Sequence, residues 1–170
     1  MLLLCAVLTL PFMIPVSIPG VSTVFGLAIL SIGVGVTLNR VPWLPGRVLD
    51  RPLSTVSLRN AFEKSAGIVS RLERLVRPRW SWLTRTPTAR FAHGLSLVLS
   101  ALLLMLPFGL VPFSNTLPAL AALLLALGLI ERDGVSIAAG YVMNVVTIVY
   151  FGSLVAGAIA AGQGAWSLMR

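Results

Sequence analysis

The chain has 170 residues, of which 57% are hydrophobic and only 11% are charged, and its mean hydropathy is +0.96. Because soluble domains carry roughly 25% charged residues, this composition excludes an ordinary soluble domain and predicts an integral membrane protein. The formal net charge is +8, so the chain is strongly basic as well as apolar.

The charge is concentrated in one central segment. Residues 1–39 carry no charge, whereas residues 40–91 hold eleven of the thirteen Lys and Arg residues against three acidic ones, which leaves +8. The four charges of residues 92–170 cancel. Basic loops stay on the cytoplasmic side of a membrane and attract anionic lipid headgroups. We therefore expect segment 40–90 to be cytoplasmic, with membrane lipid and no nucleic acid as its partner.

The first predicted element is a helical hairpin over residues 1–38. One apolar block covers residues 1–10 and a second covers residues 21–38. The sequence PFMIPVSIPG lies between them and holds three prolines, which no continuous helix accommodates. This arrangement predicts two helices that meet at a Pro-rich tip.

The basic segment, residues 39–91, predicts a different kind of helix. After a linker punctuated by proline, apolar residues recur at helical spacing from about Ser54 to Pro78, with Arg and Lys between them. A basic face, an apolar face and flanking Trp residues are typical of an amphipathic helix in the membrane interface. The alternative is a helix that packs on the protein's own cytoplasmic surface.

A second hairpin is predicted over residues 92–133. Its apolar blocks, Ala92–Leu106 and Leu117–Ile130, have 15 and 14 residues, whereas a membrane crossing needs about 20. Such short blocks on either side of a Pro-rich loop favour re-entrant hairpins, whose irregular backbone must then be satisfied by protein or by a wet cavity. The alternative extends each block through its loop to make an ordinary crossing.

The two hairpins share a sequence pattern. LPFMIPVS, residues 10–17, matches LPFGLVPFS, residues 106–114, with one residue inserted. Paired, interrupted apolar segments are found at the binding sites of transporters built from inverted repeats. The pattern predicts two related hairpins, with an inverted repeat as one option and chance similarity between apolar sequences as the alternative.

The last predicted element, residues 134–170, is a transmembrane helix. Its apolar run, Val135–Ala161, has 27 residues and is long enough to cross with tilt. Small residues recur every four positions at Gly152, Ala156 and Ala160, and small residues allow close helix packing in lipid. We therefore predict a homodimer through this seam, with Asn144 and Thr147 able to donate hydrogen bonds across it.

Polar residues gather at the two predicted hairpin tips. Hydroxyl and amide groups there can bind an ion or a polar solute, although Ser, Thr and Asn also cap helix ends routinely. The candidate binding residues are Ser17, Ser22 and Thr23 at the first tip, and Ser114, Asn115 and Thr116 at the second.

Three consecutive charges, Glu131, Arg132 and Asp133, follow the second hairpin. They fit a neutralised turn between two helices, with Gly134 as the left-handed residue after the helix end. The alternative is a charged switch, in which one carboxylate faces a cavity and exchanges protons or cations.

Enzyme chemistry finds no support in the sequence. Cys5 and His93 are the only residues of their types, so neither a metal site nor a disulfide is predicted, and we expect no cofactor. His93 begins an apolar block, which favours a position at the membrane interface.

Three motifs resemble those of the ExoD family of bacterial inner-membrane proteins. They are IPGVSTVFGLAIL with NRVPWLP, RLERLVRPR, and VPFSNTLPALAALLLALGLIERDG, in residues 18–45, 71–79 and 111–134. The resemblance covers nearly the whole chain and implies a multi-pass inner-membrane protein connected with exopolysaccharide production. It implies no reaction.

Two functions from different classes are compatible with these features. The favoured hypothesis is a small transporter or channel-like protein that moves an ion or a lipid-linked polar solute in envelope or exopolysaccharide metabolism. The alternative is a regulatory or scaffold subunit of the exopolysaccharide synthesis machinery, which transports nothing.

Overall fold

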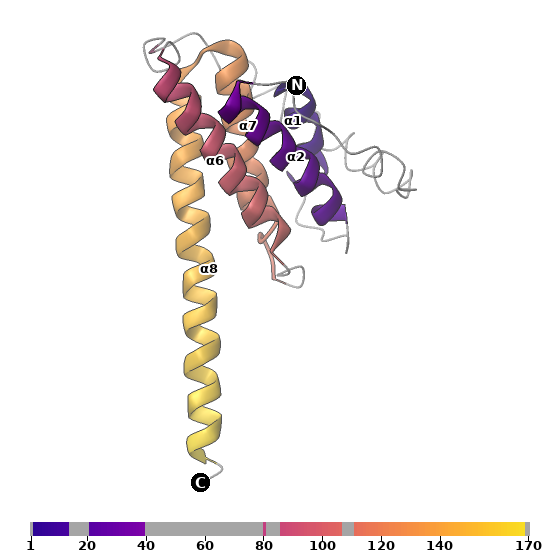
Figure 1. The fold of residues 1–170 in the computed structure, drawn as a ribbon. Helices are drawn as coiled ribbons and strands as arrows, with labels where there is room; N and C mark the ends of the chain where they lie inside the picture. The colour runs from indigo at the N-terminus through magenta and orange to yellow at the C-terminus, as the bar shows by residue number, and fades with distance from the viewer. Residues whose placement is uncertain (1, 14–20, 40–79, 81–85, 107–110, 169–170) are drawn as a thin grey trace.

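A computed structural model describes residues 2–13, 21–39, 80, 86–106 and 111–168. Every element in this part of the chain is helical, which confirms the all-α prediction (Figure 1). The elements are α1 (Leu2–Thr9), the short 3-10 helix η1 (Leu10–Met13), α2 (Val21–Leu38), α6 (Pro87–Met105), α7 (Thr116–Glu131) and α8 (Gly134–Leu168). The predicted amphipathic helix and Ser17 lie outside the described residues.

Helices α2 and α6 pack closely because glycines remove side chains from their contact. A Cβ atom on Gly33 would lie 2.9 Å from the backbone nitrogen of Val98, and one on Gly94 would lie 2.7 Å from the Cα atom of Thr37. Residues later in α2 contact residues earlier in α6. The two helices are therefore antiparallel. In lipid, where hydrophobicity does not drive helices together, the packing that such close backbone approach allows is one source of helix association.

Helices α7 and α8 form a second close antiparallel pair. A Cβ atom on Gly128 of α7 would lie 2.9 Å from the backbone nitrogen of Ile137, and one on Gly140 of α8 would lie 2.7 Å from Cγ of Leu125. Both glycines are buried, and α7 is almost entirely apolar. Small residues therefore set the spacing of both main helix pairs.

Helices α6 and α8 are parallel. His93 contacts Tyr141, and Ser96 contacts Asn144, so that both pairs are separated by 48 residues. Combined with the two antiparallel pairs, this means that α2 and α7 run in the same direction. The two predicted hairpins therefore share one orientation, whereas an inverted repeat would require opposite ones.

The core lies where α1, α2, α6 and α7 meet. Its largest fully buried apolar side chains include Ile29, Ile32, Leu97, Leu104 and Leu123. Phe12 of η1 meets Phe25 of α2 edge to face, with ring centroids 5.7 Å apart. Helix α1 packs mainly on α7, which joins the two predicted hairpins into one body.

Helix α6 is longer than the sequence pattern predicts. It begins at Pro87, five residues before Ala92, because the Thr86 hydroxyl caps it by accepting a hydrogen bond from the Ala89 backbone N–H (3.3 Å) and proline is favoured in the first turn. Its 19 residues span about 28 Å, close to the roughly 30 Å of a bilayer core. The helix is therefore longer than the apolar block from which it was predicted.

Two described helices, α6 and α8, are long and apolar enough to cross a membrane. The apolar part of α8, Gly134–Gln163, has 30 residues and spans about 45 Å. Figure 1 shows that α8 continues well beyond the other helices towards the C-terminus. Almost every side chain from Gly152 to Gln163 is exposed, so this half of α8 has no partner within the described chain.

Candidate functional site

The loop before α7 is held against α8. The Ser114 hydroxyl donates to the carbonyl of Val111 (2.9 Å), and the Tyr150 hydroxyl donates to the carbonyl of Pro112 (2.8 Å). Ser114 is buried, whereas Phe113 has a positive φ of 63° and is exposed. These bonds fix the backbone of the predicted second tip, and the hydroxyl of Ser114 already serves the loop itself.

Asn115 and Thr116 lie at the start of α7, and neither side chain caps the helix. Asn115 is only 7% exposed and occupies the N-cap position, but its side chain makes no capping hydrogen bond. Thr116 Oγ1 is buried and has no hydrogen-bond partner among the described residues. A buried polar atom without a partner costs about 1–3 kcal/mol, and this one lies at the N-terminal end of a helix.

The first tip is only partly described. Ser22 is half-buried and Thr23 is exposed, both in the first turn of α2. The 3-10 helix η1, which precedes this tip, contacts α7. The structure therefore brings the N-terminal side of the first tip to the helix that carries Asn115 and Thr116.

The charged triplet forms the turn between α7 and α8. The backbone N–H groups of Arg132 and Asp133 both donate to the carbonyl of Gly128, the second over 2.8 Å. Arg132, with φ 55° and ψ 38°, is the left-handed residue, so the prediction of Gly134 in that role is wrong. Gly134 is instead the first residue of α8 and is buried.

Asp133 begins the next helix. One carboxylate oxygen accepts from the Val135 backbone N–H (3.0 Å) and the other from the Ser136 hydroxyl (2.8 Å). Asp133 is 2% exposed, whereas Glu131 and Arg132 are exposed. Both oxygens of the buried carboxylate therefore accept hydrogen bonds from the first turn of α8.

The predicted seam on α8 faces away from the bundle. Gly152, Ala156 and Ala160 are all exposed, and a Cβ atom on Gly152 would meet nothing within 4 Å. Asn144 and Thr147, expected beside the seam, are buried inside the chain instead. Thr147 donates to the carbonyl of Met143 on its own helix (2.7 Å), and Asn144 bonds to α6.

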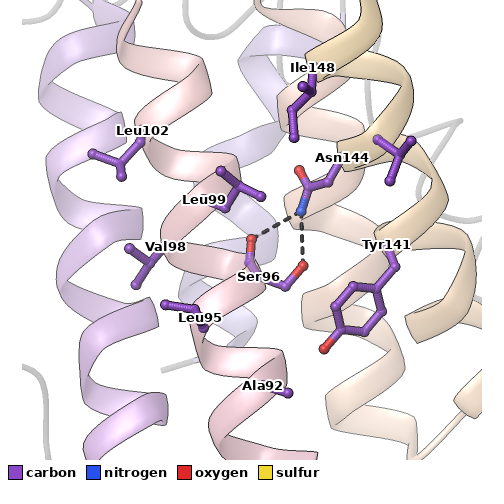
Figure 2. Close-up of a pocket in the computed structure, with 10 residues that line it drawn as sticks. Ala92, Leu95, Ser96, Val98, Leu99, Leu102, Tyr141, Asn144 and Ile148 are labelled. Carbon is purple, nitrogen blue, oxygen red and sulfur yellow. Dashed lines mark hydrogen bonds between the residues drawn. The ribbon is translucent and has the colours of Figure 1, made fainter.

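An apolar groove of about 480 Å³ runs between α6 and α8 (Figure 2). Leu95 and Leu102 of α6 and Val145 and Ile148 of α8 are each about half exposed along it. Its volume lies in the range of small-molecule sites, roughly 300–1,000 Å³. Its lining residues are Ala92, Leu95, Ser96, Val98, Leu99, Leu102, Tyr141, Asn144, Val145 and Ile148.

A buried polar cluster closes the floor of this groove. The Asn144 amide nitrogen donates to the Ser96 hydroxyl (2.9 Å) and to the Ser96 carbonyl (3.1 Å), as Figure 2 shows, while its oxygen accepts from the Ser100 hydroxyl (2.9 Å). Nearer the helix N-termini, His93 Nδ1 and the Tyr141 hydroxyl are 2.9 Å apart. The cluster joins α6 to α8, and the polar groups of the Asn144 side chain are hydrogen-bonded within the protein.

Sequence reasoning did not find this cluster. Its signal is the spacing of polar residues at positions 93, 96 and 100 in an otherwise apolar helix, which places them on one face. His93, for which the sequence predicts a position at the membrane interface, is 3% exposed and contacts Tyr141 of α8. Among the described residues, no group of three His, Cys, Asp or Glu side chains is placed to hold a metal ion.

Comparison with known proteins shows which family the chain matches. A family model described as "Exopolysaccharide synthesis, ExoD" matches residues 1–153. The chain is 56% identical over 163 residues to "Protein ExoD" of Rhizobium meliloti (strain 1021), covering 96% of this chain and 68% of that protein. It is 28% identical over 140 residues to "Uncharacterized protein slr1875" of Synechocystis sp. (strain ATCC 27184 / PCC 6803 / Kazusa), covering 82% of this chain and 65% of that protein. No solved structure matches.

In the part of the chain that the structure describes, all elements are helical and two apolar helices have membrane-spanning length. The family match covers residues 1–153. The chain belongs to the ExoD family, which is linked to exopolysaccharide synthesis. This confirms the resemblance that the sequence motifs indicated.

Proposed function

We propose that the chain is a multi-pass protein of the bacterial inner membrane that moves an ion or a small polar solute, in the service of exopolysaccharide synthesis. The observation that carries the proposal is the unpartnered, buried hydroxyl of Thr116 beside the buried Asn115 at the N-terminus of α7. A buried polar atom without a partner is costly, and a helix N-terminus adds N–H groups and a favourable field for anions.

The backbone of the loop before α7 is also held in place, which supports a binding role for its side chains. The loop is tied to α8 by Tyr150 and to itself by Ser114, so the backbone is held while two side chains remain available. Asn offers both donors and an acceptor, which suits a solute of mixed polarity. The proposal includes no enzymatic step.

Flux measurements in proteoliposomes test the proposal. We expect Asn115→Ala and Thr116→Val to abolish flux of the transported solute. The melting temperature should stay near that of the wild type in Asn115→Ala and should stay the same or rise in Thr116→Val, because valine removes a buried hydroxyl without a partner. Thr116→Ser keeps the hydroxyl and should keep flux, and Ser153→Ala, on the exposed part of α8, is the control away from the site. Loss of flux that tracks loss of folded protein in all variants would assign the loop a structural role only.

A second candidate is a scaffold or regulatory subunit of the exopolysaccharide machinery. The exposed half of α8 favours it, because an apolar surface of small residues without an internal partner is suited to helix–helix association. A second copy of the chain is the simplest occupant. Wild-type protein that carries no flux across a broad panel of ions and polar solutes, but co-purifies with a polysaccharide-synthesis protein through α8, would favour this candidate over transport.

A further inference from the structure

The loop before α7 contains a tight turn whose third residue disfavours the conformation that it adopts. The backbone N–H of Ser114 donates to the carbonyl of Val111 (3.3 Å), which closes a β-turn over these four residues. Pro112 is the second residue, and proline holds φ near −65°. Phe113 is the third residue, with φ 63°. A turn with this pair of φ values is of type II, which ordinarily requires glycine or asparagine at the third position.

A type I turn suits this sequence better. It keeps the hydrogen bond between the first and fourth residues, accepts proline at the second position and gives the third residue a negative φ, which phenylalanine adopts readily. The two turns differ by the rotation of one peptide unit, the one between Pro112 and Phe113, and this rotation reverses the directions of its carbonyl and its N–H. Both residues are exposed, so the rotation moves no buried side chain of the turn.

Tyr150 of α8 holds the disfavoured orientation of this peptide. Its hydroxyl donates to the carbonyl of Pro112 (2.8 Å), which is the carbonyl that the rotation would turn away. The left-handed conformation disfavours a residue with a Cβ atom by about 5- to 30-fold in population, whereas one hydrogen bond favours the state that makes it by about 2- to 13-fold. Because these ranges overlap, the two orientations lie close in free energy, and a single contact decides between them.

We propose that the peptide between Pro112 and Phe113 is a two-state peptide switch, set by the Tyr150 hydroxyl, in the loop that leads to Asn115 and Thr116. With the bond made, the carbonyl faces α8 and the N–H points the opposite way. With the bond broken, the two groups change places, so each side of the loop exchanges a donor for an acceptor. The role of the switch rests on the proposed function, because a solute at the start of α7 would meet a different loop in each state and would favour the state that it binds better.

A double-mutant cycle on the unfolding of the full chain in detergent tests the peptide switch. Phe113→Gly should shift the equilibrium towards the folded state by about fivefold, because glycine adopts a positive φ without strain. In a Tyr150→Phe background the same change should shift it by about twofold at most, since the turn has then already rotated and Phe113 has a negative φ. Arg132→Gly is the matched control: Arg132 is also left-handed (φ 55°) but follows the far end of α7, so its gain should be equal in both backgrounds.

Nuclear magnetic resonance reports the orientation of the peptide itself. Labelling of proline carbonyls with ¹³C and of phenylalanine with ¹⁵N selects the three Pro–Phe pairs of the chain, at residues 11–12, 107–108 and 112–113, and Phe113→Leu identifies the last by removing its signal. In a type II turn the Hα proton of Pro112 lies next to the amide proton of Phe113, and the rotation separates them. The nuclear Overhauser effect between these protons should therefore be strong in the wild type and fall severalfold in Tyr150→Phe.

Two results would overturn the peptide switch. One is an equal gain from Phe113→Gly with and without the Tyr150 hydroxyl, and the other is a nuclear Overhauser effect that Tyr150→Phe leaves unchanged. The bond from Tyr150 is exposed, so Tyr150→Phe should fold. Neither measurement uses solute flux: a switch that is confirmed in a chain without transport activity would overturn the transport proposal alone.

Discussion

Gly94 of α6 lies so close to Thr37 of α2 that a Cβ atom on Gly94 would stand 2.5 Å from the backbone nitrogen of Thr37. The obstacle is backbone, which cannot rotate away as a flexible side chain can. The pairing of α2 and α6 therefore depends on the absence of a side chain at this position, as it does at Gly33 against Val98.

Gly94→Ala should consequently destabilise the protein. Overpacking a close contact costs about 1–3 kcal/mol, which thermal unfolding in detergent would report as a lower melting temperature. The matched control is Gly157→Ala in the exposed half of α8, where a Cβ atom meets nothing within 4 Å. There the better helix propensity of alanine should leave the protein unchanged or more stable by up to about 1 kcal/mol. Equal effects at the two glycines would contradict the close packing of α2 on α6.

The hydrogen bond from the Ser100 hydroxyl to Asn144 (2.9 Å) should show up as an energetic coupling between α6 and α8. Interhelical hydrogen bonds in membrane proteins contribute about 0.6 kcal/mol on average. A double-mutant cycle with Ser100→Ala and Asn144→Ala, measured by unfolding, should give a coupling of about this size. Val142→Ala with Ser100→Ala serves as an uncoupled pair, because Val142 is exposed on α8. Strict additivity in both pairs would argue against the buried cluster.

Arg132→Gly should stabilise the turn between α7 and α8. Arg132 occupies the left-handed region with φ 55°, a conformation that costs a residue with a Cβ atom roughly 1–2 kcal/mol and glycine little. We expect a higher melting temperature in the variant. Asp133→Ala, which removes the acceptor for Val135 and Ser136, should move stability the other way by about 1 kcal/mol. A destabilised Arg132→Gly would show that the guanidinium makes an interaction that matters more than the backbone strain.

Single-cysteine labelling should place the two ends of the bundle on opposite sides of the membrane. Asn39, Thr86 and Glu131 lie at one end and Phe113 at the other, and α6 is long enough to cross. In a Cys5-replaced background, cysteines at Thr55, Ser81 and Glu131 should react with reagents from the cytoplasmic side only, as the basic segment requires. Phe113→Cys should react from the periplasmic side. Labelling of Phe113→Cys from the cytoplasm alone would instead indicate the re-entrant hairpin, and periplasmic labelling at Ser81 would reverse the orientation.

Self-association through α8 remains a prediction from the small-residue seam. Ala156→Leu together with Ala160→Leu should weaken a dimer, because the larger side chains keep two helix backbones apart. Both alanines are exposed in the single chain, so its own fold should survive the change. Val155→Leu, on a neighbouring exposed position, is the control. Molar mass from light scattering in several mild detergents gives the readout, and a wild type that is monomeric in all of them would contradict the prediction.

Much of the local structure follows from the sequence alone. The apolar blocks, the prolines between them and the charged triplet correctly indicate helices that end near residues 38, 105 and 131. These features are local, because helix breaking by proline and the exclusion of charge from apolar runs depend on a few neighbouring residues. The apolar pattern did not predict the start of α6, because Thr86 and Pro87 begin the helix by capping geometry before any apolar residue appears.

What each face of a helix meets was decided only by the tertiary structure. Asn144 was predicted beside a dimer seam, but the fold turns it to Ser96 and Ser100 of α6. Thr116 carries no local sign that its hydroxyl would be buried without a partner. The physical reason is that apolar helices are nearly equivalent towards lipid, so hydrophobicity does not select their partners. The close contacts of glycines such as Gly94 and the few available hydrogen bonds select them instead, and those depend on residues about 50 positions apart in the chain.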